Sequence, residues 1–194
     1  MTDFAYSPMF PQAADDTAYE LVSSEHVEMV ELGGEQFLKV DPEALRLLAQ
    51  RAFTDISHLL RSSHLAQLRA ILADPEATQN DRFVALEMLK NAVVAADGLL
   101  PMCQDTGTAI ISGTRGDRVL VTGDDGEALS RGVYDTYQES NLRYSQLAAT
   151  SMFDEVNTAT NLPAQIDLYA GKGTEYKFAF IQKGGGSANK TFLH

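Results

Sequence analysis

The sequence predicts an α+β fold (mixed α/β), in which a helical scaffold packs on a small, mostly antiparallel β-sheet. Three amphipathic helical patterns follow one another between residues 41 and 96. Short apolar runs bounded by glycine turns dominate the second half, and such turns are typical of hairpins. The length of 194 residues fits one domain, or one domain and a small part of another.

The N-terminal region is predicted to hold an arm and two strands. Residues 1–18 contain prolines and several acidic residues, which indicates an extended N-terminal arm. Short strands are expected at residues 20–22 and 36–40, with Gly33-Gly34 as the turn between them.

Asp41-Pro42-Glu43 is a strong helix start. Asp41 can cap the helix, Pro42 suits the first helical position, and Glu43 favours the positive end of the helix dipole. His58 and His64 lie near the end of this helix without an obvious ligand partner, and we interpret them as surface or packing histidines. The helix-spaced apolar residues predicted to face the core are Leu45, Leu48, Ala52, Ile56 and Leu59.

Two more amphipathic helices complete the scaffold. The first carries apolar residues from Leu65 to Leu72 and stops at Asp74-Pro75, and the second runs from about residue 80 to residue 96. In the second half, glycine-containing turns join each pair of strands into a hairpin. The elements predicted there are strands at residues 108–112, 118–122, 166–170 and 175–182 and a helix at residues 127–142, with Leu129, Val133 and Tyr137 inward.

The only cysteine lies in the stretch Pro-Met-Cys-Gln-Asp-Thr-Gly-Thr-Ala at residues 101–109. A helical pattern precedes this stretch and an apolar run follows it, so the thiol of Cys103 is expected on a tight loop that enters a strand. A thiolate is a soft metal ligand, and a cysteine with a lowered pKa is a nucleophile. The remaining alternative is a buried structural thiol, although Gln104, Asp105 and Thr106 are unusually polar neighbours for one.

Two later positions also invite a chemical interpretation. Arg143 is either a cation that suits a helix end or an anchor for a substrate carboxylate, which guanidinium binds bidentately. The glycines between Lys183 and Thr191 can turn backbone amides toward an anion. A P-loop needs glycine directly before its Lys-Thr pair, where this chain has Asn189, so a small carboxylate fits better than a nucleotide.

The composition limits the partners. A hydrophobic fraction of 44% is ordinary for a globular core, and a net charge of −12 disfavours nucleic acid and anionic membranes, because both would be repelled. No apolar run approaches the ~20 residues of a membrane span, and residues 1–10 show no secretory signal. One cysteine cannot form an intrachain disulfide, so a reducing, cytoplasmic setting is expected.

Four stretches share one resemblance. They are residues 101–109, residues 134–143, residues 161–166 with the sequence Asn-Leu-Pro-Ala-Gln-Ile, and residues 183–190. In this order they resemble class I fumarate hydratase, the iron–sulfur type, and the resemblance extends over nearly the whole chain.

The resemblance implies a reversible hydro-lyase of the tricarboxylic acid cycle, which adds water across fumarate to give (S)-malate. The family holds a [4Fe–4S] cluster with three cysteines and leaves one iron open as a Lewis acid. Cys103 matches the first cysteine ligand, and Gln104, Asp105 and Arg143 match positions that contact substrate. Gly186 matches a glycine whose backbone contacts substrate. Asp105 is the expected proton-transfer residue, and the family is homodimeric and binds a small dicarboxylate.

The chain is also shorter than the family's catalytic chain, and it has no second or third cysteine. We therefore expect residues 19–194 to be part of the N-terminal cluster-binding domain, in a fragment truncated at its C-terminal end. One thiolate cannot hold a cubane cluster, so the fragment alone is expected to bind no cofactor and to be inactive. The alternatives are a relative that acts on tartrate or mesaconate and a non-catalytic folding or interaction module.

Overall fold

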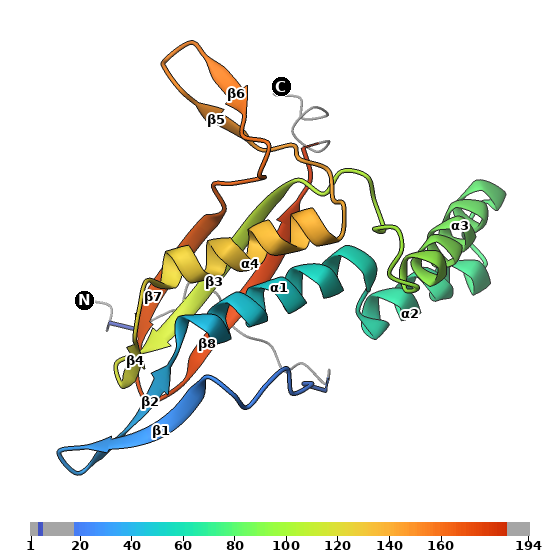
Figure 1. Ribbon diagram of the computed structural model, residues 1–194. Coiled ribbons are helices and arrows are strands. Elements are labelled where there is room, and N and C mark those ends of the chain that lie inside the picture. The colour runs from blue at the N-terminus through green and yellow to red at the C-terminus, as the bar shows by residue number, and fades with distance from the viewer. Residues whose placement is uncertain (1–3, 6–17, 186–194) are drawn as a thin grey trace.

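The computed structural model describes residues 4–5 and 18–185, and these ranges contain four helices and eight strands (Figure 1). Three strand pairings are antiparallel and two are parallel, which confirms the predicted α+β class. Most of the predicted arm at residues 1–18 lies outside the described residues. The elements are β1 (Val27–Leu32), β2 (Glu35–Val40), α1 (Pro42–His58), α2 (Ser62–Ala73), α3 (Gln79–Ala95), β3 (Thr108–Gly116), β4 (Val119–Val121), α4 (Asp125–Glu139), β5 (Leu147–Ala149), β6 (Glu155–Asn157), β7 (Gln165–Gly171) and β8 (Tyr176–Lys183).

The helix starts follow from local capping. The Asp41 side chain accepts a hydrogen bond from the Glu43 backbone N–H at 2.8 Å, and Pro42 is the first helical residue of α1, as predicted. Thr78 and Asp81 form a reciprocal capping box at the start of α3, which begins one residue before the predicted position. These caps satisfy backbone donors that a helix end otherwise leaves without partners.

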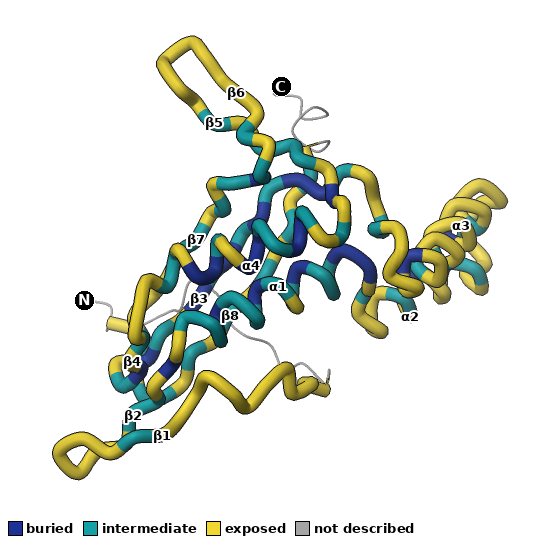
Figure 2. Tube along the Cα trace, in the orientation of Figure 1, coloured by how far each residue is buried: buried dark blue, intermediate teal, exposed yellow. Residues whose placement is uncertain are grey.

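The core forms where α1 and α4 lie side by side across the sheet of β7, β3 and β8 (Figures 1 and 2). Gly132 permits this close approach, because a Cβ there would lie 2.7 Å from the Ala49 Cβ. The buried face of α1 is Leu45, Ala49 and Phe53, so the predicted stripe was correct at Leu45 and wrong at Leu59, which is exposed. The buried core residues are Val40, Leu45, Ala49, Phe53, Ala109, Ile111, Val119, Ala128, Leu129, Val133, Tyr137 and Leu142.

Strand β3 is the central strand of its sheet. It pairs in parallel with β7 and antiparallel with β8, whereas β4 joins the other sheet in parallel with β2. The predicted hairpin of residues 108–112 with 118–122 is therefore wrong. Both edges of β3 are already occupied, and the chain crosses at Asp117 and Arg118 to the second sheet.

The same central position of β3 rules out the predicted hairpin between the last two strands. The segment after Gly171 does connect β7 to β8, but the two strands flank β3 instead of pairing with each other. The sheet order is consequently β7-β3-β8.

The first hairpin has its turn and its second strand where they were predicted, but its first strand lies later in the sequence than predicted. Gly33 and Gly34 form its turn with φ values of 62° and 86°, and β1 and β2 pair from Leu32–Glu35 outward. A two-residue turn requires the partner strand to end at residue 32, so residues 20–22 cannot supply it and are not a strand.

Helix α4 ends before the predicted position. Asp124 caps its start by accepting a hydrogen bond from the Glu127 N–H at 2.8 Å, and the helix stops at Glu139. Asn141 then has a φ of 49°, which is incompatible with a continuing right-handed helix. Leu142 and Arg143 therefore leave α4 and enter the segment that leads to β5.

Two parts project from this body. Helices α2 and α3 form a hairpin, and β5 and β6 form a two-stranded ribbon, with mostly exposed residues in both (Figures 1 and 2). At the ribbon tip, Met152 and Phe153 are 88% and 90% exposed. Across the described ranges, none of the helices combines the length and apolar character that crossing a membrane demands.

Candidate functional site

The candidate site is built around the loop of residues 96–107 between α3 and β3, which we call the cysteine loop. Cys103 is exposed in this loop, and its Sγ accepts a hydrogen bond from the Asp105 backbone N–H at 3.4 Å. The position on a loop that enters a strand is as predicted, and the alternative of a buried structural thiol is wrong. An exposed thiol is open to a ligand or reaction partner.

The helices hold the residue that precedes the thiol. The Met102 backbone N–H donates to the Ser57 carbonyl in the last turn of α1 at 2.8 Å. The Met102 carbonyl accepts from the Asn91 Nδ2 of α3 at 2.7 Å. Both backbone groups of Met102 are thus fixed, and the start of the loop is anchored to two helices.

Tyr137 of α4 contacts the C-terminal end of the cysteine loop. Its hydroxyl lies 2.8 Å from the Thr106 carbonyl oxygen and 3.1 Å from the Gly107 carbonyl oxygen, and it is fully buried. Burial raises the pKa of Tyr137 to about 12, because the phenolate would lose its hydration. The hydroxyl therefore stays protonated and remains a donor over the ordinary pH range.

The second segment of the site, residues 183–185, lies directly against the cysteine loop. Gly107 has a φ of +57°, and a Cβ there would overlap the Lys183 carbonyl oxygen and lie 2.7 Å from the Gly184 Cα. A Cβ on Gly184 would lie 2.8 Å from the Asp105 Oδ2. Only glycine permits these approaches, so the carboxylate of Asp105 lies beside the start of the glycine-rich stretch.

The third segment of the site comprises residues 140–146, which we call the arginine segment. Thr106 donates its hydroxyl to the Arg143 carbonyl oxygen at 2.9 Å, and Thr108 donates its hydroxyl to the Gln146 Oε1 at 2.8 Å. Arg143 itself is exposed. The structure thus brings the backbone of Arg143 next to the cysteine loop.

Not every predicted residue falls in the described part of the chain. Gly186 and the following residues up to Thr191 lie outside it, so the predicted anion site is described only at Lys183, Gly184 and Gly185. His58 is buried with its Nδ1 2.8 Å from the Thr54 carbonyl oxygen, and His64 is exposed, as the interpretation of packing and surface histidines requires.

Metal-binding groups are sparse in the described ranges. Among residues 4–5 and 18–185, no three His, Cys, Asp or Glu side chains lie close enough together to hold a metal ion. The ligand that the sequence analysis singled out, Cys103, is a single exposed thiol.

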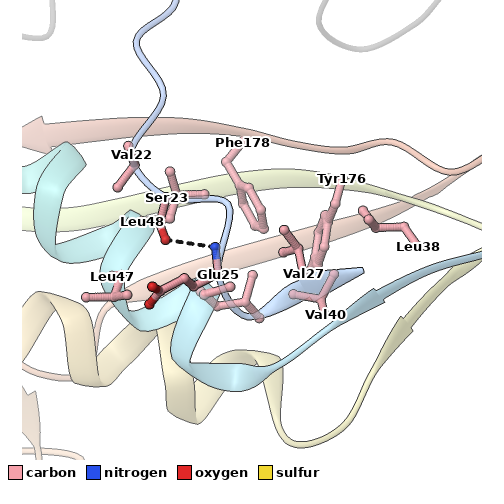
Figure 3. A pocket seen from close by; sticks show the side chains of 12 residues that line it. Val22, Ser23, Glu25, Val27, Leu38, Val40, Leu47, Leu48, Tyr176 and Phe178 are labelled. Carbon is pink, nitrogen blue, oxygen red and sulfur yellow. Dashed lines mark hydrogen bonds between the residues drawn. The ribbon is translucent and has the colours of Figure 1, made fainter. Parts of the chain in front are cut away.

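A separate cavity of about 170 Å³ lies between α1, β1, β2, β8 and the segment that precedes β1 (Figure 3). Its walls are largely apolar, and the Glu25 backbone N–H donates to the Ser23 Oγ at 3.0 Å beside it. None of the residues that line this cavity belongs to the three segments described above, so it is not part of the candidate site. The lining residues include Val22, Val27, Leu38, Val40, Leu47, Leu48, Tyr176 and Phe178.

Sequence reasoning missed three residues that shape the site. Thr106 and Tyr137 were recognised only as a polar neighbour and as a core residue, and Asn161 only as part of a turn. Asn161 is fully buried with a φ of 58°, and its side chain contacts both the cysteine loop and the arginine segment. A buried asparagine in left-handed backbone carries no signal in a single sequence that distinguishes it from an ordinary turn residue.

The chain belongs to the fumarate hydratase family, because the family model described as Fumarate hydratase (Fumerase) matches residues 46–194.

Three of the relatives are named as class I or mitochondrial fumarate hydratases. The chain is 59% identical to "Fumarate hydratase class I, anaerobic" of Escherichia coli (strain K12), over 98% of this chain and 35% of that protein. It is 60% identical to "Fumarate hydratase class I, aerobic" of the same strain, with the same coverage. It is 57% identical to "Fumarate hydratase 1, mitochondrial" of Leishmania major, over 100% of this chain and 36% of that protein. The chain spans about a third of the length of these relatives.

Proposed function

We propose that this chain is part of a hydro-lyase that interconverts fumarate and (S)-malate. The observation that carries the proposal is the meeting of three segments that are far apart in the sequence. Thr106 joins the cysteine loop to Arg143, and Gly107 and Asp105 contact the Lys183–Gly184 backbone. The side chains of these segments include a guanidinium, a carboxamide and a carboxylate, which are groups suited to binding a short dicarboxylate.

Each residue has a distinct proposed role. The Arg143 guanidinium binds one substrate carboxylate through two parallel hydrogen bonds. The Gln104 carboxamide hydrogen-bonds the substrate and fixes its orientation, and the backbone of Gly186 supplies another contact. The Asp105 carboxylate carries the proton that leaves or joins the substrate hydroxyl, which is the work of a general acid or base.

The exposed thiol of Cys103 fits the cofactor that the class I enzymes are expected to use. Thiolates are the ligands that hold iron–sulfur clusters, and Cys103 is open to such a ligand. Bound there, a [4Fe–4S] cluster would supply a Lewis acid. The chain contains no other cysteine. We therefore propose that residues 19–194 contribute one ligand as part of a cluster-binding domain, and that this chain alone neither holds a stable cluster nor hydrates fumarate.

The setting of the protein is part of the same proposal. It is a cytoplasmic homodimer that acts on small dicarboxylates in the tricarboxylic acid cycle. The net charge of −12 supports the absence of nucleic acid and anionic membranes from its partners.

The test is Asp105→Asn in the full-length protein that contains this chain, assembled with its cluster under anaerobic conditions. The change keeps the shape of the side chain and removes its ability to transfer a proton. We expect kcat for fumarate hydration to fall by about 10²–10⁴, the usual contribution of general acid–base catalysis. The assay follows the conversion of fumarate to malate.

Asp74→Asn is the matched control, because Asp74 is an exposed carboxylate that lies outside the three segments of the site. It should leave kcat unchanged. Full activity of Asp105→Asn would remove the proton-transfer role. A wild-type protein that converts mesaconate or tartrate but not fumarate would show that the substrate is a different one.

A further inference from the structure

Asn161 is the one fully buried side-chain amide near the site among the described residues. Its Oδ1 accepts hydrogen bonds from the Ser145 backbone N–H at 3.0 Å and from the Gln146 backbone N–H at 3.1 Å. Its Nδ2 donates to the Gly107 carbonyl oxygen at 2.9 Å. One carboxamide therefore bridges the arginine segment and the cysteine loop.

The backbone conformation of Asn161 does not by itself explain why an asparagine stands at this position. Its φ of 58° lies in the left-handed region, where glycine is the least strained residue and asparagine is tolerated. Glycine would serve the backbone at this position at least as well. The carboxamide, which glycine lacks, is thus the feature that the bridge requires.

The bridge joins two segments whose separation affects how a dicarboxylate can bind. A short dicarboxylate that is held at one end by Arg143 and elsewhere by Gln104 and Asp105 must span the distance between two separate segments. Such sites work only when the groups are held within about 0.5 Å of the productive geometry. The Thr106 bond to the Arg143 carbonyl and the Thr108 bond to the Gln146 Oε1 also join these parts. Asn161 adds three hydrogen bonds, two to the backbone of the arginine segment and one to Gly107.

We infer that Asn161 is a positioning residue, which holds Arg143 at the right distance from Gln104 and Asp105 for both segments to bind one dicarboxylate. The inference rests on the proposed function. Asn161 does not touch the ligand, and it acts through Arg143.

The variant that tests this role is Asn161→Gly in the full-length protein with its cofactor assembled. Glycine keeps the left-handed backbone and removes all three hydrogen bonds. The probe is a saturated four-carbon dicarboxylate, which binds without reacting, and its Kd is measured by calorimetry. We expect Kd to rise about tenfold or more and KM for fumarate to rise with it. Ala159→Gly is the matched control, because Ala159 is also left-handed but is exposed and lies outside the three segments, and it should leave Kd unchanged.

A double-mutant cycle separates positioning from a general structural role. If Asn161 acts through Arg143, then Asn161→Gly should change Kd by less than twofold once Arg143→Ala has removed the guanidinium. Equal fold-changes in both backgrounds would overturn the inference.

Asn161→Asp covers the case in which the glycine variant does not fold. It keeps the two acceptor contacts to Ser145 and Gln146, and it replaces the donor to Gly107 with a repelling oxygen. A folded Asn161→Asp with wild-type Kd would overturn the inference, and so would loss of folding in both variants, which assigns Asn161 a purely structural role. A wild-type protein that binds no dicarboxylate would instead refute the proposed function.

Discussion

Replacing Tyr137 by phenylalanine tests how much the hydrogen bonds between α4 and the cysteine loop contribute to stability. The change removes only the hydroxyl that lies 2.8 Å from the Thr106 carbonyl oxygen and 3.1 Å from that of Gly107. Gly107 keeps the hydrogen bond from Asn161, so the Thr106 carbonyl is the group that loses a buried donor. A buried polar group left without its partner costs about 1–3 kcal/mol, and we expect that loss in the free energy of unfolding near pH 8.

The difference in the free energy of unfolding between the wild type and Tyr137→Phe should become smaller in alkaline solution. The pKa of Tyr137 is raised from 10.0 to about 12 in the folded protein. The unfolded chain therefore releases this proton first, and stability falls as pH rises from 10 toward 12. At pH 11 the wild type should have lost about 1.4 kcal/mol through this residue, whereas the phenylalanine variant has no such proton to lose.

Urea unfolding followed by circular dichroism at pH 8 and pH 11 measures both effects. Tyr176, whose pKa burial also raises, is present in both proteins, and its contribution cancels in the comparison. Equal slopes of free energy against urea concentration would show that the unfolded states are alike. If the difference between wild type and Tyr137→Phe is the same at both pH values, the reasoning about the buried hydroxyl is refuted.

Two further substitutions test the loop and its scaffold by the same urea measurement. Gly107→Ala should cost about 3 kcal/mol or more, because it combines left-handed strain with an overlap on the Lys183 carbonyl. Gly173 has a φ of +88° and open space around it, so Gly173→Ala should cost only about 1–2 kcal/mol. An equal cost at both glycines would contradict the close packing at Gly107. Thr78→Ala should lower stability by about 1 kcal/mol, because it removes the capping box with Asp81, and an unchanged midpoint would mean that the cap contributes nothing.

The sequence predicted best what is decided by neighbouring residues. The cap at Asp41, the stop near Asp74-Pro75 and the turn at Gly33-Gly34 depend on contacts a few residues apart, and all three are present. Strand pairing is different, because a glycine turn indicates where a strand ends but not which strand lies beside it. The hairpin predictions therefore failed wherever β3 took its partners from elsewhere in the chain.

In the candidate site, too, the features set by neighbouring residues were predicted and those set by distant residues were not. The helical pattern before the only thiol and the apolar run after it were sufficient to predict a loop that enters a strand, and that loop is present. The supports of the loop could not be predicted in the same way. The hydroxyl of Tyr137 and the carboxamide of Asn161 act through carbonyl groups that are 30 and 54 residues away in the sequence. Composition and periodicity do not report such contacts.

The central place of β3 has a consequence for how this polypeptide is made. Both strands that flank β3 are translated after it, and the later of them ends at Lys183. While the ribosome is still short of that point, the nascent chain cannot close the sheet, because long-range strand pairs form only once both partners exist. The thiol of Cys103 emerges near the middle of these 194 residues, yet it is among the last groups to acquire its final surroundings.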